Sequence, residues 1–237
     1  MRLILKFKLE HEKFTNQYRN FLTSYFKFAL SKEYYDEFSK YYENPQTKNF
    51  TFTVFIKNLK HYNGLIISPN KEIIMTISSS DYKFIMLLYN SLLMNKNKKM
   101  NISPNNKIRL SQLSLTHLKE INNNEIKIKM LSPLLIRDRD IENNIDSYKT
   151  IKDDNFIKYL NDNLIYLAKS LNLNINKLEI TPIKTKKVVV PIMQVRYDAT
   201  IGTFKLKGDL ETLNTLYKIG IGSRRSYGFG MFEVIND

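Results

Sequence analysis

The spacing of apolar residues changes along this chain in an order that occurs twice. In residues 2–9 every second residue is apolar, which is typical of a half-buried strand, whereas aromatic residues recur every three or four positions from Phe14 to Tyr42, as on one face of a helix. Ser31 can begin the second part of this helical region, and Ser79 or Ser80 can cap the next helix. A lysine-rich loop then leads to a further strand. The strands are expected at residues 2–9, 50–55, 72–78 and 107–115, and the helices at 14–42 and about 80–92.

The second series begins at about residue 125 and has the same order. After its first strand comes a polar loop, and Asp153 or Asp154 can cap a helix with a clean apolar face. A hairpin follows, and then a short helix from Asp209, which Gly220 can end in a left-handed cap. The strands are expected at residues 125–130, 186–197, 200–207 and 230–234, and the helices at 154–171 and 209–219.

Strand, helix, strand, strand, helix, strand is the order of the ferredoxin-like fold. The fold class is therefore α+β, with two tandem ferredoxin-like (βαββαβ, RRM-like) domains at residues 1–120 and 121–237, joined near residues 122–124. A length of 237 residues is compatible with two small domains. The two halves share no residue-level repeat, so the order of the elements alone carries this prediction.

The composition excludes several kinds of chemistry. The chain has no cysteine, which excludes disulfides, thiolate metal sites and cysteine nucleophiles. Its histidines, His11, His61 and His117, lack the spacing of three to five residues that zinc sites use, so we expect no metal and no cofactor. No apolar run approaches the roughly 20 residues that cross a bilayer, and the first residues do not read as a signal peptide. The expected location is the cytoplasm, away from membranes.

The net charge is +14. A bias of composition towards lysine and asparagine would explain it by solvated lysines. A polyanionic partner would explain it as well, because lysine and arginine gain affinity by releasing counterions from phosphates, and the 15 tyrosines offer rings on which unpaired bases can stack.

Four of the seven glycines lie between Gly220 and Gly230, around Arg224 and Arg225. This is neither a phosphate-binding P-loop nor a dinucleotide fingerprint, because these glycines follow a helix and precede a strand. Glycines let a backbone approach a phosphate or another backbone closely, and two arginines supply forks suited to phosphate. A simple helix cap accounts for Gly220 but not for the composite pattern.

At these residues the chain resembles the CRISPR-associated repeat-processing endoribonucleases of the RAMP superfamily, which mature precursor CRISPR RNA. Their hallmark loop, G-x-G-x₅-G-F-G, is matched from Gly220 to Gly230. Further similar segments are Ser132-Pro133, the helix with Asn163-Leu164, the strand from Gly202 to Gly208 and Phe50-Thr51-Phe52-Thr53.

The resemblance implies cleavage within CRISPR repeats without a metal. The 2′-hydroxyl attacks the phosphate, which leaves a 2′,3′-cyclic phosphate and a 5′-hydroxyl. It also implies that the hairpin of the second half and the glycine-rich loop bind the repeat RNA. The RNA-binding residues would be Lys184, Lys186, Lys187, Arg196, Gly220, Gly222, Ser223, Arg224, Arg225, Ser226, Gly228 and Gly230.

The catalytic residues that the resemblance suggests depart from the family pattern. Many relatives place a histidine after the first helix, but residues 39–44 contain none. The matching lysine is Lys48, and the position of a tyrosine in relatives falls near Lys27, with Tyr25 as an alternative. Either Lys27, Tyr42 and Lys48 form a site without histidine, or His11 or His61 enters from a neighbouring loop.

Two other functions remain open on the sequence. The first is a non-catalytic RAMP subunit that binds RNA in a CRISPR effector complex, because the expected histidine is missing. The second is a regulator with tandem RNA-recognition motifs, since Tyr227–Phe232 superficially resembles an RNP1 strand, although it lies on the last strand rather than the third. CRISPR effector subunits and a second copy of this chain are further partners that the resemblance allows.

Overall fold

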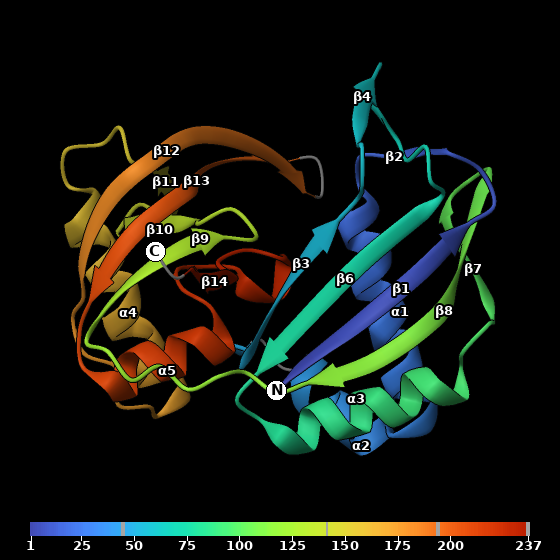
Figure 1. Cartoon of the computed structure of the whole chain (residues 1–237), viewed down its shortest axis with the longest axis horizontal. Helices are drawn as coiled ribbons and strands as arrows, with labels where there is room; N and C mark the ends of the chain where they lie inside the picture. Colours follow the sequence, from blue (N-terminus) through green and yellow to red (C-terminus); the bar gives the residue numbers. More distant parts are fainter. Residues whose placement is uncertain (44–45, 141, 193–194, 236–237) are drawn as a thin grey trace. The chain divides into compact units, whose positions relative to one another are not determined.

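The structure of the protein is a computed structural model that describes residues 1–43, 46–140, 142–192 and 195–235. Figure 1 shows strands and helices alternating along the chain. The elements are β1 (Arg2–Leu9), β2 (Lys13–Thr15), α1 (Tyr18–Glu33), α2 (Tyr35–Tyr42), β3 (Phe50–Phe55), β4 (Lys60–Tyr62), β5 (Leu65–Ile67), β6 (Glu72–Ser79), α3 (Tyr82–Met94), β7 (Lys99–Ser103), β8 (Asn106–Thr116), β9 (Glu125–Met130), β10 (Ile136–Asp140), β11 (Ile145–Lys149), α4 (Phe156–Leu171), β12 (Glu179–Ile192), β13 (Val195–Lys207), α5 (Leu210–Ile219), the 3₁₀ turn η1 (Arg225–Tyr227) and β14 (Phe232–Ile235).

The chain divides into two compact units. Unit 1 contains Met1–Gln46 and Thr53–His117, with Pro191 and Ile192, and unit 2 contains Thr47–Phe52, Leu118–Val190 and the chain from Val195 onward. The change of unit after His117 lies close to the predicted domain boundary. No pattern in the sequence predicted that Thr47–Phe52 belongs to unit 2.

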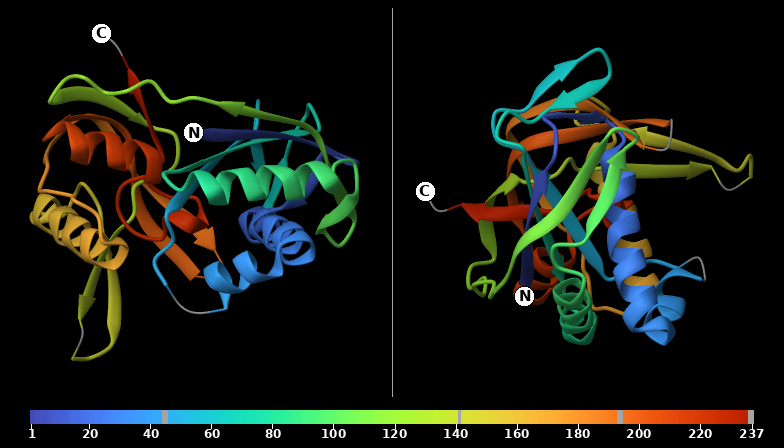
Figure 2. Two further views of the ribbon diagram at one scale, coloured as in Figure 1. Left: turned by 90° about the horizontal axis from the view of Figure 1, so that it is seen from below. Right: turned by 90° about the vertical axis from the view of Figure 1, so that its right-hand side faces the viewer.

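Unit 1 is built on a sheet with the strand order β3-β6-β1-β8-β7, and residues 50–52 of β3 are assigned to unit 2. The alternation in β1 has the predicted effect, since Leu3, Leu5 and Phe7 are fully buried. Phe7 packs edge-on against Tyr25 of α1, with 5.4 Å between ring centroids. The helices of this unit lie on one side of the sheet (Figure 2), so that the other face of the sheet carries the polar residues of β1 and β8.

Unit 2 has a sheet with the order β12-β13-β9-β14. Its core is formed where β9 meets the apolar faces of α4 and α5, and it includes Ile128, Leu160, Leu164, Leu213 and Leu216. When the ferredoxin-like strands of each unit are numbered in chain order, both sheets have the order 2-3-1-4. The predicted tandem ferredoxin-like fold is therefore confirmed.

Six strands, in three places, are missing from the sequence prediction. Within the expected lysine-rich loop, Met100 and Ile102 alternate with polar residues, and this segment forms β7 beside β8. The expected polar loop after β9 contains the hairpin of β10 and β11. Both strands are almost entirely polar, and ion pairs across the hairpin, such as Arg137 with Asp146 at 2.7 Å, replace an apolar face. In addition, β2, β5 and β4 form a small separate sheet.

Three predicted helix caps are wrong by one to three residues. Ser31 lies within α1, and Tyr34 is the residue before α2. Asp81, rather than Ser79 or Ser80, caps α3 by accepting a hydrogen bond from the N–H of Phe84 at 3.0 Å. The residue before α4 is Asn155, whose side chain makes no cap. The predicted cap Asp153 instead accepts a hydrogen bond from the N–H of Thr150. Asp209 does cap α5 as predicted, through the N–H of Thr212 at 2.8 Å. Among the helices of the described residues, none combines the length and hydropathy that a membrane span requires.

Candidate functional site

The glycine-rich loop of unit 2 connects α5 to β14, and its glycines allow protein backbones to approach one another. Gly220, Gly222 and Gly230 have φ of 82°, 82° and 75°, which other residues rarely adopt. A Cβ on Gly222 would lie 2.5 Å from the carbonyl oxygen of Leu135, and one on Gly230 would lie 1.9 Å from that of Ile221. Gly220 has ψ of 168°, so the helix ends in an extended residue rather than in the predicted left-handed cap.

Backbone hydrogen bonds fix the loop on both sides. The N–H of Ile221 donates to the carbonyl of Gly230 at 2.9 Å, which closes the loop upon itself. The N–H of Ser223 donates to Leu135 at 2.7 Å, and that of Gly230 donates to Pro133 at 2.9 Å. These donors are directed at protein carbonyls. The glycines therefore shape the loop: the N–H groups of Gly220 and Gly230 donate to the carbonyls of Leu216 and Pro133, and Gly222 lies against the backbone of Leu135. Contact of Gly220, Gly222 and Gly230 with RNA stays a prediction.

The other family-like segments form the surroundings of this loop. The buried Ser132 hydroxyl accepts a hydrogen bond from the N–H of Met231 at 2.9 Å. Thr51 donates to the carbonyl of Phe229 at 2.7 Å, and its side chain lies against Gly220. Asn163 of α4 bonds both the N–H and the carbonyl of Arg137 in β10 and accepts from the Ser223 hydroxyl. Motifs that are far apart in the sequence thus meet at one place in unit 2.

Arg225 is not available to a ligand. Its side chain is buried, and its guanidinium donates to the carbonyl of Lys48 at 2.8 Å and to that of Ile219 at 3.4 Å. Burial lowers the pKa of Arg225 below its ordinary value. The sequence prediction placed Arg225 among the RNA-binding residues, but the structure gives this side chain the role of an internal brace between the loop and the segment before β3.

Arg224, by contrast, lies at the surface of unit 2 among aromatic rings. Its guanidinium lies 5.1 Å from the ring centroid of Tyr197, and its Nε donates to the Tyr148 hydroxyl at 3.0 Å. Burial alone would lower its pKa, but the bond to Tyr148 and the charge of Asp146 outweigh burial and raise the pKa of Arg224. The side chain is exposed to 35%. It is therefore a partly exposed cation held in place by Tyr148, Tyr197 and Asp146, whose carboxylate lies 3.9 Å away.

The long hairpin of β12 and β13 carries the remaining predicted cations of unit 2. Lys184, Lys186, Lys187 and Arg196 are exposed, and Lys187 pairs with Asp198 at 2.6 Å. Gly202 allows the two strands to approach closely, because a Cβ there would lie 2.1 Å from the carbonyl oxygen of Lys184. Ser223 and Ser226 are half-buried, whereas Gly228, like the other glycines of the loop, is buried.

The predicted catalytic residues Lys27 and Tyr42 lie together in unit 1. The Lys27 ammonium group lies 5.0 Å from the ring centroid of Tyr42, which itself stacks on Phe38. The alternative Tyr25 is fully buried, and burial raises its pKa to about 12, which makes it a poor acid or base. Burial, followed by the hydrogen bond to Asp81, also raises the pKa of Tyr41. Tyr41 therefore belongs to the core.

Lys48 belongs to unit 2, where its carbonyl receives the bond from Arg225 and its side chain is partly exposed. His11, His61 and His117 are exposed in unit 1, and the backbone of His11 is bonded to Asn106. Nothing in the sequence pointed to Tyr148 and Asp146 as the partners of Arg224, because they lie in the hairpin that was expected to be a loop. Among the described residues, no three side chains of the acidic and histidine types form a group that could hold a metal ion.

Comparisons with known proteins agree with this geometry. Residues 116–234 match the family model described as "CRISPR associated protein Cas6, C-terminal", which is just over half of the chain. No curated protein matches in sequence. The solved structure described as "Characterization of a Cas6-related gene from Pyrococcus furiosus" is similar with a TM-score of 0.88 and 18% identity, over 100% of this chain and 99% of the other.

Two further solved structures share the fold. One, described as "An RAMP protein binding different RNA substrates", has a TM-score of 0.85 and 18% identity over 100% of both chains. Another, described as "CRISPR associated protein Cas6", has a TM-score of 0.77 and 20% identity over 100% of this chain and 99% of the other. Since the matched segment contains the whole glycine-rich loop together with Ser132-Pro133 and Asn163, the loop and its surroundings place the chain in the CRISPR-associated Cas6 family.

Proposed function

We propose that the chain is an endoribonuclease that cuts precursor CRISPR RNA within each repeat. The observation that carries this proposal is the match of residues 116–234 to the Cas6 family across a loop whose shape depends on its glycines. Further support comes from solved relatives, since one is described as binding RNA and another as a Cas6 product complex, the latter with a TM-score of 0.70 and 14% identity.

The proposed reaction is an in-line displacement that needs no metal ion. The 2′-oxygen of the RNA forms a bond to phosphorus and loses its proton to water. The bond from phosphorus to the 5′-oxygen breaks as that oxygen gains a proton from an ammonium group. The products are a 2′,3′-cyclic phosphate and a 5′-hydroxyl. The protein must orient the strand and stabilise the negative charge that develops on the phosphate.

We assign this work to Lys27, Tyr42 and Lys48. An ammonium group can stabilise the developing charge and supply a proton to the leaving oxygen. The contact of Lys27 with the Tyr42 ring supports a joint role for these two side chains, because the ring holds the ammonium group by a cation–π interaction without neutralising it. For Lys48 the support is the buried Arg225, which fixes the backbone of Lys48 relative to the loop.

RNA binding is assigned to the exposed cations of unit 2. Arg224 can receive a phosphate or stack against a base together with Tyr148, and Ser223 and Ser226 can donate hydrogen bonds to phosphate oxygens. The cations of the hairpin add further contacts from Lys184, Lys186, Lys187 and Arg196. In this division of work, residues 1–120 hold most of the catalytic groups and residues 121–237 hold the repeat.

The experiment is a cleavage assay with the cognate repeat RNA in EDTA. A single cut that leaves a cyclic phosphate supports the proposal, and we expect Lys48→Ala and Lys27→Ala each to slow the cut about 100-fold. Lys169→Ala, which removes an exposed lysine at the end of α4, is the matched control and retains the wild-type rate. If the Lys48→Ala variant cleaves at the wild-type rate, Lys48 is not part of the catalytic site.

The second candidate is a non-catalytic RNA-binding subunit of a CRISPR effector complex. The observation that favours it is that residues 39–44, where relatives place a histidine, contain none. Tight binding of the repeat without any cut, at concentrations of protein far above the dissociation constant, supports this candidate and contradicts the endoribonuclease.

A further inference from the structure

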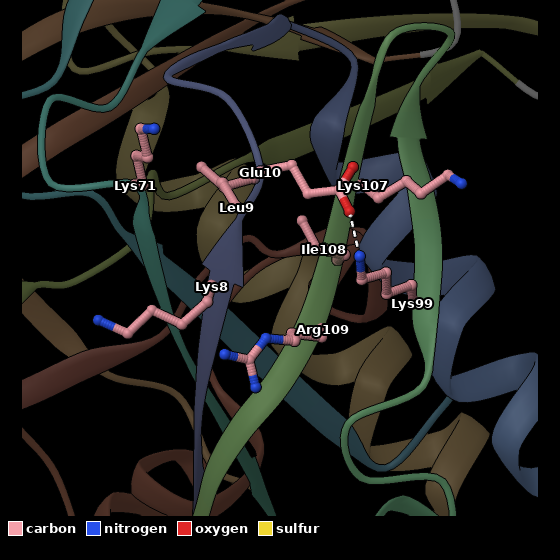
Figure 3. Close-up of a pocket in the computed structure, with 8 residues that line it drawn as sticks. All are labelled: Lys8, Leu9, Glu10, Lys71, Lys99, Lys107, Ile108 and Arg109. Atoms are coloured by element: carbon pink, nitrogen blue, oxygen red, sulfur yellow. Dashed lines mark ion pairs between the residues drawn. The ribbon is translucent and has the colours of Figure 1, made fainter.

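The open face of the sheet in unit 1 carries three cations in one row. In the register of the sheet, Lys8 of β1 lies opposite Arg109 of β8, and Arg109 lies opposite Lys99 of β7. Residues directly opposite one another in antiparallel strands point to the same face, and like charges there destabilise the sheet. Arg109 therefore lies between two side chains of its own charge, as Figure 3 shows.

The acidic residues nearby neutralise only the two ends of this row. Lys8 pairs with Glu72 at 2.9 Å, and Lys99 pairs with Glu10 at 2.6 Å. Arg109 in the middle donates only to the neutral amide oxygen of Asn97, at 3.3 Å. Over the described ranges of the chain, neither Arg109 nor the neighbouring Lys71 and Lys107 takes part in an ion pair. The Glu10 carboxylate also lines the pocket; the hydrogen bond from Lys99 and the charges of Lys99 and Lys107 lower its pKa, so that one carboxylate lies among five cations.

These side chains surround a pocket of about 340 Å³. Its lining includes Leu9 and Ile108, whose side chains are buried in the sheet beneath it. Lys71 lies at the left of this group and Lys107 at its right, with Glu10 between them and Arg109 below (Figure 3). This volume is at the lower end of the range for small-ligand sites, and it is large enough for a phosphate with its sugar.

We propose that this pocket is a second binding site for the RNA strand, in which Arg109, Lys107 and Lys71 bind its backbone phosphates. The proposal rests on the proposed function, because it takes the same RNA as its ligand. A guanidinium presents paired N–H groups that match the oxygens of one phosphate, and the flanking lysines act as point charges for that phosphate or its neighbour. An anion also removes the repulsion along the row Lys8–Arg109–Lys99.

The test compares two double variants of the full chain that lose the same charge. Lys107→Gln/Arg109→Gln alters the pocket, and Lys83→Gln/Lys169→Gln removes exposed lysines from α3 and α4. Fluorescence anisotropy measures the binding of a repeat RNA whose scissile nucleotide carries a 2′-deoxy sugar, at several KCl concentrations. We expect the pocket variant to bind roughly tenfold more weakly. Its slope of log K against log[KCl] falls by about 1.4, since each phosphate contact on a single strand contributes about 0.7.

A second measurement with pyrophosphate tests whether the pocket binds the phosphates of RNA or those of free phosphate compounds. The effect of pyrophosphate on the melting temperature is measured for both double variants at constant ionic strength. A shift of the control variant but not of the pocket variant, combined with the loss of RNA affinity, supports the proposal. The same shift with unchanged RNA affinity assigns the pocket to free phosphate compounds and overturns the RNA strand as its ligand. Equal RNA affinities and equal salt slopes in the two variants, without a pyrophosphate effect, overturn the pocket altogether. Failure of the wild-type protein to bind the repeat contradicts the proposed function instead.

Discussion

Replacing Gly230 by alanine tests whether close backbone contact holds the glycine-rich loop in shape. Gly230 has φ of 75°, and its new Cβ would lie 1.9 Å from the carbonyl oxygen of Ile221. Gly64, in the turn between β4 and β5, has nearly the same φ, 73°, but nothing lies within 4 Å of the position of its Cβ. The pair therefore separates the cost of the backbone conformation from the cost of the contact.

The expected destabilisation follows from the contacts that must separate. The positive φ alone costs an alanine about 1–2 kcal/mol, which is the whole effect at Gly64. At Gly230 the backbone must also move away from Ile221, which breaks the bond from the Ile221 N–H to Gly230 and strains the bond from Gly230 to Pro133, both 2.9 Å long. Each such bond contributes about 0.5–1.5 kcal/mol. Gly230→Ala should therefore cost about 2–5 kcal/mol in all.

Urea unfolding followed by circular dichroism measures the free energy of unfolding of each variant, and hydrogen exchange of residues 216–234 locates the change. We expect hydrogen exchange of these residues to be faster in Gly230→Ala and unchanged in Gly64→Ala. RNA cleavage should be lost only in Gly230→Ala. If Gly230→Ala costs no more than Gly64→Ala, backbone contact does not restrain the loop, and the reasoning about its glycines is refuted.

Three further predictions concern single side chains. Asp209→Ala removes the cap of α5 and should lower the free energy of unfolding by about 1 kcal/mol, whereas Asp154→Ala, an exposed residue outside a helix, should leave urea unfolding unchanged. Burial raises the pKa of Tyr25 from 10.0 to about 12, so the contribution of the neutral Tyr25 to stability is complete below pH 10 and is lost as pH rises to 12. Tyr25→Phe should reduce this alkaline loss of stability by about 3 kcal/mol, and identical pH profiles of unfolding in the two proteins would contradict it. Arg224→Ala should lower the salt slope of RNA binding by about 0.7. Arg225→Met should instead lower the free energy of unfolding by about 2 kcal/mol or more. If folded Arg225→Met shows a reduced salt slope, Arg225 contacts RNA and is not an internal brace.

The fold could be predicted from the sequence because the spacing of apolar residues marks its strands and helices. Alternation in β1 and β9 and the apolar face of α4 marked the elements, and their order identified the ferredoxin-like arrangement. The hairpin of β10 and β11 was not accessible, because cross-strand ion pairs stabilise it and ion pairs leave no period in hydrophobicity. The alternation of β7 was hidden by Lys96, Lys98 and Lys99, which made the segment resemble a loop.

The candidate site was predictable only in part. The glycine pattern located the loop, but Arg224 and Arg225 are adjacent residues of the same type, and only the structure shows that one is exposed and the other buried. The turn at η1 causes the difference, since Arg224 adopts the left-handed conformation with φ of 49° and directs its neighbour inward. A sequence pattern does not report the direction of two consecutive side chains at such a turn.

The bond between Thr51 and Phe229 joins residues 178 positions apart, and it affects how the protein is made. During synthesis, the segments at Thr51, Ser132 and Asn163 all leave the ribosome before the loop that they surround. Until Phe232–Ile235 follow, β9 lacks the neighbour that it has in the finished sheet and presents an unpaired edge. Since contacts of such long sequence separation form slowly, the nascent chain passes through a period in which unit 2 is open to misassociation. A ribosome that stalls before Gly220 leaves a chain with most of the core but without the loop.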